Sequence, residues 1–203
     1  MRSGTLKFLA LLLLVSRVHA GDWRVTGDAD CNKVTFHSEA TLESFDGETH
    51  AIRGALSFPG TTIDSTSMAN FSVDLLQLTT GIDLRDSHMR DNHLHTSKYP
   101  TTEYTVDRVL SGGELQDGVP LTIRVDGKFQ LHGITRDLPL DVTLTWYADG
   151  QGTACSTPGP VLRMQAAWDV ALADHEIPRP AFLFMKMAES VNMRLDAWAV
   201  PAP

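Results

Sequence analysis

The 203-residue sequence has few cysteines and no surplus of positive charge. Because its only two cysteines lie far apart in the sequence, a zinc cluster built on cysteine and a C-x-x-C redox motif are both excluded. Lysine and arginine together number 17 against 25 aspartates and glutamates, which gives a formal net charge of −8. A protein that binds the phosphate backbone shows a basic face or stripe. The charge balance therefore argues against a nucleic-acid partner, and none is assigned.

Sequence motifs of several common enzyme classes are also missing. The chain contains no G-x-S-x-G pentapeptide, which the nucleophile-elbow hydrolases require. It has neither a P-loop nor a dinucleotide-binding fingerprint. Carboxylates are numerous, but their spacing singles out no acid–base pair. No catalytic residue is assigned.

One apolar run stands out, and it lies at the N-terminus. Arg2 and Lys7 precede the unbroken run at residues 8–15, and Val18-His19-Ala20 ends in small residues at the usual cleavage spacing. The run is too short to span a bilayer, which needs about 17 to 25 apolar residues. The pattern predicts a signal peptide at residues 1–20, cleavage after Ala20, and a single exported domain at residues 21–203.

The two cysteines are Cys31, near the start of the mature chain, and Cys155, in a stretch rich in glycine, serine, threonine and proline. An even number of cysteines in an oxidising compartment favours a disulfide bond. The alternative is two unpaired thiols, one buried and one on a loop.

Alternation of apolar and polar residues runs through most of the mature chain and predicts about eight strands. The predicted strands are residues 33–42, 52–58, 71–75, 104–108, 121–125, 134–146, 162–172 and 187–197. Only residues 84–95 break the alternation, which indicates a short helix between the third and fourth strands.

Many strands with short connections and no βαβ rhythm predict an all-β antiparallel sandwich or closed barrel. Closure into a barrel leaves no exposed strand edge. An eight-stranded barrel is just wide enough to be filled by side chains or to hold one slender ligand. Both interiors, an ordinary core and a ligand cavity, are compatible with this composition.

Three histidines fall close together in the predicted helical stretch: His88, His93 and His95. A metal site would need them to converge on one centre at about 2 Å. Their spacing matches no standard zinc signature, so a hydrogen-bonded structural cluster is the favoured interpretation and no metal is assigned. A metal-dependent hydrolase that uses these histidines is the alternative.

Four segments together resemble the YceI-like proteins. The first carries Thr-Gly and Arg-Asp-x-His motifs that lead through a leucine to Tyr99-Pro100, and the others follow in matching order and spacing. The segments are residues 78–94, 30–36, 127–140 and 171–178. The chain departs from the family pattern at Cys31, where serine is commoner, and at His93, where an apolar or acidic residue is commoner.

This resemblance implies a lipocalin-like barrel in the bacterial periplasm whose apolar interior holds a polyisoprenoid, such as an isoprenoid quinone. It implies a binding protein and not an enzyme, with the lipid as ligand and no cofactor. A transient contact with a membrane or membrane protein is an expected partnership, as is a homodimer. An exported interaction or inhibitor module is a further alternative.

Strand parity assigns residues to the tunnel wall, and the family motif singles out three more. The predicted tunnel-lining residues are Phe36, Leu56, Phe58, Phe71, Val73, Tyr104, Val106, Phe129, Met164, Trp168, Met193 and Leu195. Arg85, Asp86 and His88 are given a structural role: an Arg–carboxylate pair and the imidazole are expected to tie the short helix to the barrel and to close one side of the tunnel.

Overall fold

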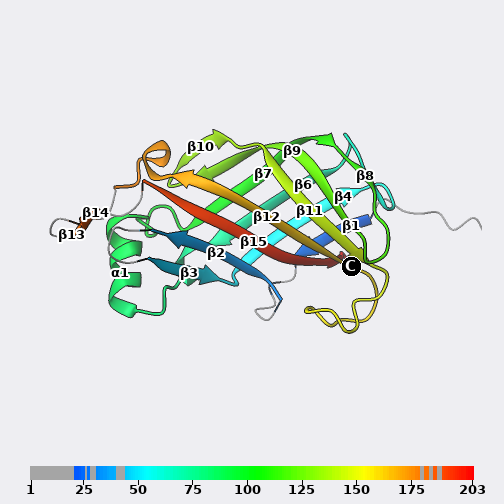
Figure 1. Ribbon diagram of the computed structural model, residues 1–203, viewed down its shortest axis with the longest axis horizontal. Coiled ribbons are helices and arrows are strands. Elements are labelled where there is room, and N and C mark those ends of the chain that lie inside the picture. The colour runs from blue at the N-terminus through cyan, green and yellow to red at the C-terminus, as the bar shows by residue number, and fades with distance from the viewer. Residues whose placement is uncertain are drawn as a thin grey trace, which may run out of the picture.

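Long antiparallel strands make up most of the computed structural model (Figure 1). The structure describes residues 21–25, 27, 31–39, 44–178, 181–182, 185–186 and 189–203. The strands are β1 (Gly21–Val25), β2 (Lys33–Ser38), β3 (Phe45–Thr49), β4 (Ile52–Phe58), β5 (Thr62–Ile63), β6 (Met68–Asp74), β7 (Thr101–Ser111), β8 (Gly113–Glu114), β9 (Pro120–Leu131), β10 (Ile134–Asp137), β11 (Leu140–Tyr147), β12 (Val161–Ala171), β13 (Ala181–Phe182), β14 (Met185–Lys186) and β15 (Ser190–Pro201). The helices are η1 (Leu75–Gln77), α1 (Asp83–Asn92) and η2 (Leu172–His175).

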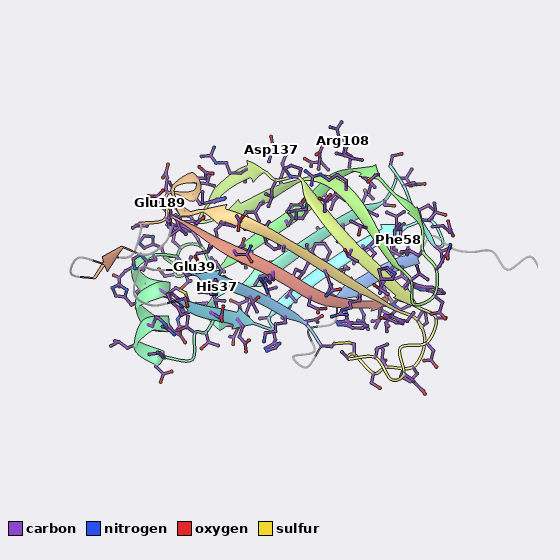
Figure 2. All side chains as sticks on the ribbon, viewed as in Figure 1. His37, Glu39, Phe58, Arg108, Asp137 and Glu189 are labelled. Carbon is purple, nitrogen blue, oxygen red and sulfur yellow. A yellow bond between two sulfur atoms is a disulfide. The ribbon has the colours of Figure 1, made fainter. Side chains whose placement is uncertain are left out.

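Eight of these strands close into a barrel, as predicted. Strands β1, β4, β6, β7, β9, β11, β12 and β15 pair in this order, and β1 also pairs with β15 to complete the ring. Every one of these pairings is antiparallel. The long strands bury alternate side chains inside the barrel, while polar residues such as Arg108 and Asp137 project from its outer surface (Figure 2).

The β2–β3 hairpin extends the barrel wall at one end. Strand β15 pairs with β1 through residues 199–201 and with β2 through residues 192–196. One edge of this long strand is therefore hydrogen-bonded to two different strands. The far edge of β3 is also held, because Glu48 and Thr79 exchange two backbone hydrogen bonds of 2.8 and 3.0 Å. Helix α1 lies at this end, opposite the C-terminus (Figure 1).

The predicted strand at residues 134–146 is wrong, because it breaks into β10 and β11. Proline at position 139 has no N–H group to donate to a ladder. The N–H of Leu138 donates instead to the carbonyl of Gly127, in the middle of β9. Strand β9 therefore pairs with β11 along its first half and with β10 along its second.

Two short strands of this sheet, β1 and β3, were not predicted. Each has five residues and buries only two of them, so neither carries enough alternation to stand out. The short helix is confirmed but ends at Asn92, three residues before the predicted end. Parts of the first and last predicted strands, residues 40–42 and 187–188, lie outside the described residues, as does the predicted signal peptide.

The predicted disulfide is confirmed: Cys31 and Cys155 are bonded, with Cα atoms 4.9 Å apart. It joins the segment before β2 to the loop between β11 and β12 and packs beside Trp198. No helix in the described part of the chain combines the length and apolar character needed to cross a membrane.

Candidate functional site: two apolar cavities

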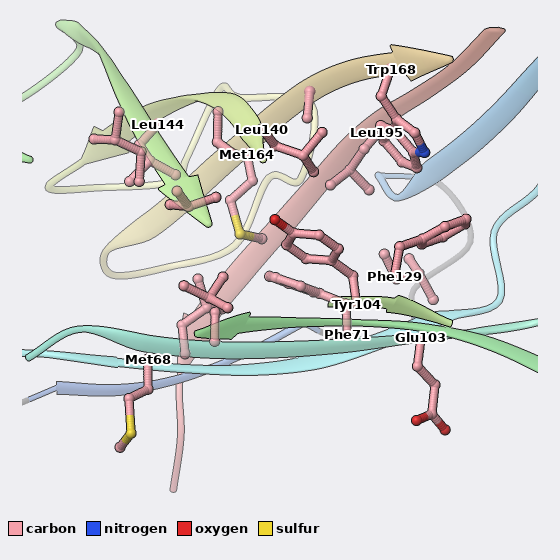
Figure 3. A pocket seen from close by; sticks show the side chains of 18 of the residues that line it. Met68, Phe71, Glu103, Tyr104, Phe129, Leu140, Leu144, Met164, Trp168 and Leu195 are labelled. Carbon is pink, nitrogen blue, oxygen red and sulfur yellow. The ribbon is translucent and has the colours of Figure 1, made fainter. Parts of the chain in front are cut away.

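The barrel interior encloses a cavity of about 110 Å³, which we call the barrel cavity. Phe71, Tyr104 and Leu140 point into it from three different strands, whereas Glu103 points away from it (Figure 3). The Tyr104 hydroxyl donates a 2.8 Å hydrogen bond to the Leu138 carbonyl. Burial, with the nearby Asp126 and other charges, raises the pKa of Tyr104 to about 12. The phenol therefore stays neutral, and its only polar atom is already bonded to the wall.

A second cavity of about 180 Å³ lies beneath α1, and we call it the helix cavity. Its apolar walls include Phe36 from β2, Leu131 from β9 and Met89 from α1. Gly47, opposite Phe36 on β3, makes room for this wall, because a Cβ atom there would lie 2.2 Å from the Phe36 ring. The glycine is thus required by the close approach of the ring.

The two cavities share part of their lining. Thr102, Phe129 and Met193 belong to both. The Thr102 hydroxyl donates a 2.7 Å hydrogen bond to the Gln130 carbonyl, so its polar group is bonded to the barrel wall. The cavities consequently lie end to end, separated by side chains that are apolar or already hydrogen-bonded.

All the predicted tunnel-lining residues lie at these cavities. The barrel cavity is lined by Leu56, Phe58, Phe71, Val73, Tyr104, Val106, Phe129, Met164, Trp168, Met193 and Leu195, and the helix cavity by Phe36. Strand parity alone was therefore enough to place these side chains inside the barrel. Their contact with a lipid stays a prediction.

Other lining residues were not predicted. Ile52, Val125 and Leu144 line the barrel cavity. Each lies on the apolar parity of a predicted strand, so the same signal was available for them. Leu94 and Ile177 line the helix cavity from loops. Nothing in the alternation of a strand could indicate residues on a loop.

Asp86 fixes the helix over its cavity. This buried carboxylate accepts hydrogen bonds from the Thr79 hydroxyl (2.6 Å) and from the Thr80 N–H and hydroxyl (2.7 and 2.5 Å). Thr80 Oγ1 in turn accepts from Arg85 Nε at 2.8 Å, so a threonine hydroxyl bridges the expected Arg–carboxylate pair. Since Thr79 also pairs with β3, this network connects α1 to the barrel wall.

The ionisation of Asp86 is stabilised by the same network. Burial opposes the charge, but the hydrogen bonds from Thr79 and Thr80, helped by Arg90, outweigh it and hold the pKa of Asp86 below its usual value. The charged carboxylate therefore contributes stability at neutral pH that is lost as the pH falls below about 4.

We expect Asp86→Ala to lower the free energy of unfolding by about 2–3 kcal/mol at pH 7, because three hydrogen bonds to a buried charge are lost. Asp91→Ala, at an exposed position of the same helix, is the control and should change stability by less than about 0.5 kcal/mol. Urea unfolding measures both, and the difference should shrink at pH 3. Equal unfolding midpoints at pH 7 would contradict the role given to Asp86.

The three histidines of the helical stretch do not converge. The rings of His88 and His93 pack edge to face with centroids 5.0 Å apart. His95 bonds elsewhere, because its Nδ1 lies 2.8 Å from Nε2 of His132. Among the described residues, no group of three or more histidine, cysteine or acidic side chains is arranged to hold a metal ion. His88 itself lies at the helix cavity, where closure of one side was expected.

The closed eight-stranded antiparallel ring around an apolar interior defines the class: this is a lipocalin-like barrel. A model of the YceI-like domain matches residues 25–199. The chain belongs to the YceI-like family, and the resemblance seen in its sequence motifs is confirmed. Among curated proteins, none matches the chain.

Several solved structures share the fold. A polyisoprenoid binding domain from Saccharophagus degradans, implicated in plant cell wall breakdown, has a TM-score of 0.66 and 17% identity over 89% of this chain and 98% of that one. BcnA from Burkholderia cenocepacia has a TM-score of 0.64 and 12% identity over 85% and 99%. The YCEI protein of Campylobacter jejuni has a TM-score of 0.51 and 12% identity over 100% and 99%. At these identities the likeness shows the fold.

Proposed function

We propose that this protein carries or sequesters an amphiphilic polyisoprenoid, such as an isoprenoid quinone or a related lipid, in its two cavities. The observation that carries the proposal is the arrangement of these cavities. Both are apolar, they lie end to end, and Phe129 and Met193 line both of them. A flexible apolar chain fits such a space better than a rigid polar molecule does. The polyisoprenoid binding domain from Saccharophagus degradans, which has the same fold, supports this choice.

The expected energies are adequate for binding. Each buried CH₂ group contributes about 0.8 kcal/mol, so a five-carbon isoprene unit contributes roughly 4 kcal/mol before ordering costs. An apolar cavity of about 150 Å³ stays dry and accepts small apolar molecules. The helix cavity, at about 180 Å³, is of this size and kind. Water would therefore compete poorly with a lipid tail.

The proposal describes a binding protein and not an enzyme. The hydrolase alternative required His88, His93 and His95 to meet at one centre, and His95 is bonded to His132 instead. The geometry of the described residues offers no observation that favours the interaction or inhibitor module. Homodimer formation and transient contact with a membrane or membrane protein stay predictions.

Binding can be followed through Trp168, which lines the barrel cavity and packs against Phe129 with ring centroids 6.1 Å apart. We expect geranylgeraniol added to lipid-free protein to change tryptophan fluorescence and to saturate near one molecule per chain. The Trp168→Phe variant should bind while losing most of that signal, because the other tryptophans do not line either cavity. A response that never saturates in the native-sequence protein would contradict the proposal.

We also expect export to the periplasm, on the evidence of the predicted signal peptide at residues 1–20. The mature chain should begin at Gly21 and be released by osmotic shock, since the apolar run is too short to anchor it. Intact-mass measurement of the released protein checks this cleavage site. Retention of Met1–Ala20 in a membrane fraction would count against a freely diffusing carrier.

A further inference from the structure

The helix cavity has a polar end. Its charged or titratable side chains, Arg85, His88 and His93, all come from α1 or the residue directly after it. The barrel cavity is apolar where Phe71, Leu140 and their neighbours meet. An amphiphile that occupies both cavities would therefore place its polar headgroup beside α1 and its tail in the barrel. This orientation of the lipid rests on the proposed function.

His93 carries a hydrogen-bond acceptor near this end. Its Nδ1 lies 2.8 Å from the carbonyl oxygen of Pro178. Because a carbonyl oxygen only accepts, the bond assigns the ring proton to Nδ1 and leaves a lone pair on Nε2. Burial lowers the pKa of His93, helped by His88 and His95, so the ring is neutral at neutral pH.

The Nε2 atom of His93 is buried and has no hydrogen-bond partner among the described residues. A buried acceptor without a partner is destabilising, and most such atoms in folded proteins are satisfied by the protein, by water or by a ligand. Nε2 is shielded even from water in this structure, so a donor reaches it only when a neighbour moves. The exposed ring of His88, which packs against His93, is the neighbour best placed to do so.

We propose that His93 Nε2 accepts a hydrogen bond from a hydroxyl on the headgroup of the bound lipid, an inference that rests on the proposed function. The preferred ligand is then a polyisoprenoid alcohol, phenol or quinol. A quinone, an ester or an ether of the same tail offers only acceptor oxygens, which would face the Nε2 lone pair without a proton between them. His93 thus discriminates between lipids that have the same tail but different headgroups, whereas the apolar walls contact only the tail.

A second buried polar atom makes the opposite prediction. The indole Nε1–H of Trp168 also has no partner among the described residues, and it would favour an acceptor such as a quinone carbonyl. His93 is preferred because it lies at the polar end of the helix cavity, beside Arg85 and His88, whereas Trp168 packs among apolar side chains such as Phe129 and Met193. Comparison of an alcohol with its ether separates the two, because only the alcohol can donate to His93 whereas both oxygens can accept from Trp168.

The test uses two ligands that differ by one donor: geranylgeraniol and its methyl ether, titrated separately into lipid-free mature protein. One neutral hydrogen bond corresponds to roughly a three- to tenfold difference in affinity, so the alcohol should bind tighter than the ether by that factor. In His93→Phe the preference should vanish while affinity for the ether is retained. His93→Gln, which keeps an acceptor, should restore part of the preference.

His37→Phe is the matched control, since His37 lies on the outer side of β2 with its Nδ1 2.7 Å from Asp46. It should leave the preference intact. Equal affinities for alcohol and ether in the native-sequence protein would overturn the role of His93 and leave the lipid carrier standing. A preference that survives His93→Phe would also overturn it, as would equal affinities for the two ligands that fall together in Trp168→Phe. If neither ligand binds, the proposed function itself fails.

Discussion

Protein carrying Val73→Trp should lose its lipid, with occupancy falling from about one molecule per chain to under about a tenth, because the larger side chain occupies the space that the tail needs. Val73 is buried on β6 and lines the barrel cavity. The cavity holds only about 110 Å³, so an indole at this position leaves little room for a guest. Lipid extraction and mass spectrometry of the purified variant measure the occupancy.

Thr35→Trp gives the control for this change. Thr35 alternates on β2 with Val34 and Phe36, which line the cavities, and therefore faces the outside of the sheet. The same substitution there should leave occupancy intact. Circular dichroism and thermal melting of both variants establish that each is folded. A folded Val73→Trp protein with full lipid occupancy would show that the ligand lies elsewhere.

Reduction of the Cys31–Cys155 disulfide should cost about 4–5 kcal/mol of stability, because it closes a loop of 124 residues and so restricts the unfolded chain. For a protein of this length that corresponds to a fall in Tm of roughly 10 °C or more. Thermal melting with and without reductant measures it. The Cys31→Ser, Cys155→Ser double variant should match the reduced protein and be insensitive to reductant.

Reduction of the disulfide should change lipid affinity much less than it changes stability. The disulfide packs with Val161 and Trp198, whereas α1 and the helix cavity lie at the opposite end of the barrel (Figure 1). Reduced protein held well below its Tm is therefore expected to keep its ligand. An unchanged Tm after complete reduction would contradict the stabilising role of the bond.

Period-two alternation predicted the barrel well because most strands have one apolar and one polar face. Strand β12, for example, alternates through Leu162, Met164 and Ala166, and all twelve residues chosen by parity lie at a cavity. The resemblance of the motifs around Arg85 and Asp86 supplied the family. Alternation shows which face of a strand is buried, provided that the strand is long enough for the apolar–polar pattern to recur several times.

The remaining features depend on contacts between segments distant in sequence. The break between β10 and β11 depends on Leu138 meeting Gly127, and ring closure depends on β1 meeting the end of β15. The acceptor on His93 exists only because Pro178 fixes the ring proton on the other nitrogen. Neither composition nor local pattern contains these pairings, so the polar end of the helix cavity could not be predicted from the sequence.

The central claim is that the two adjacent cavities hold a polyisoprenoid lipid, and native mass spectrometry of the protein tests it most directly. Protein purified from its native source and kept free of detergent should carry close to one lipid per chain. That added mass should disappear on solvent extraction, and the extract should yield a polyisoprenoid. A folded, disulfide-bonded protein with no added mass and no lipid in its extract would contradict the claim.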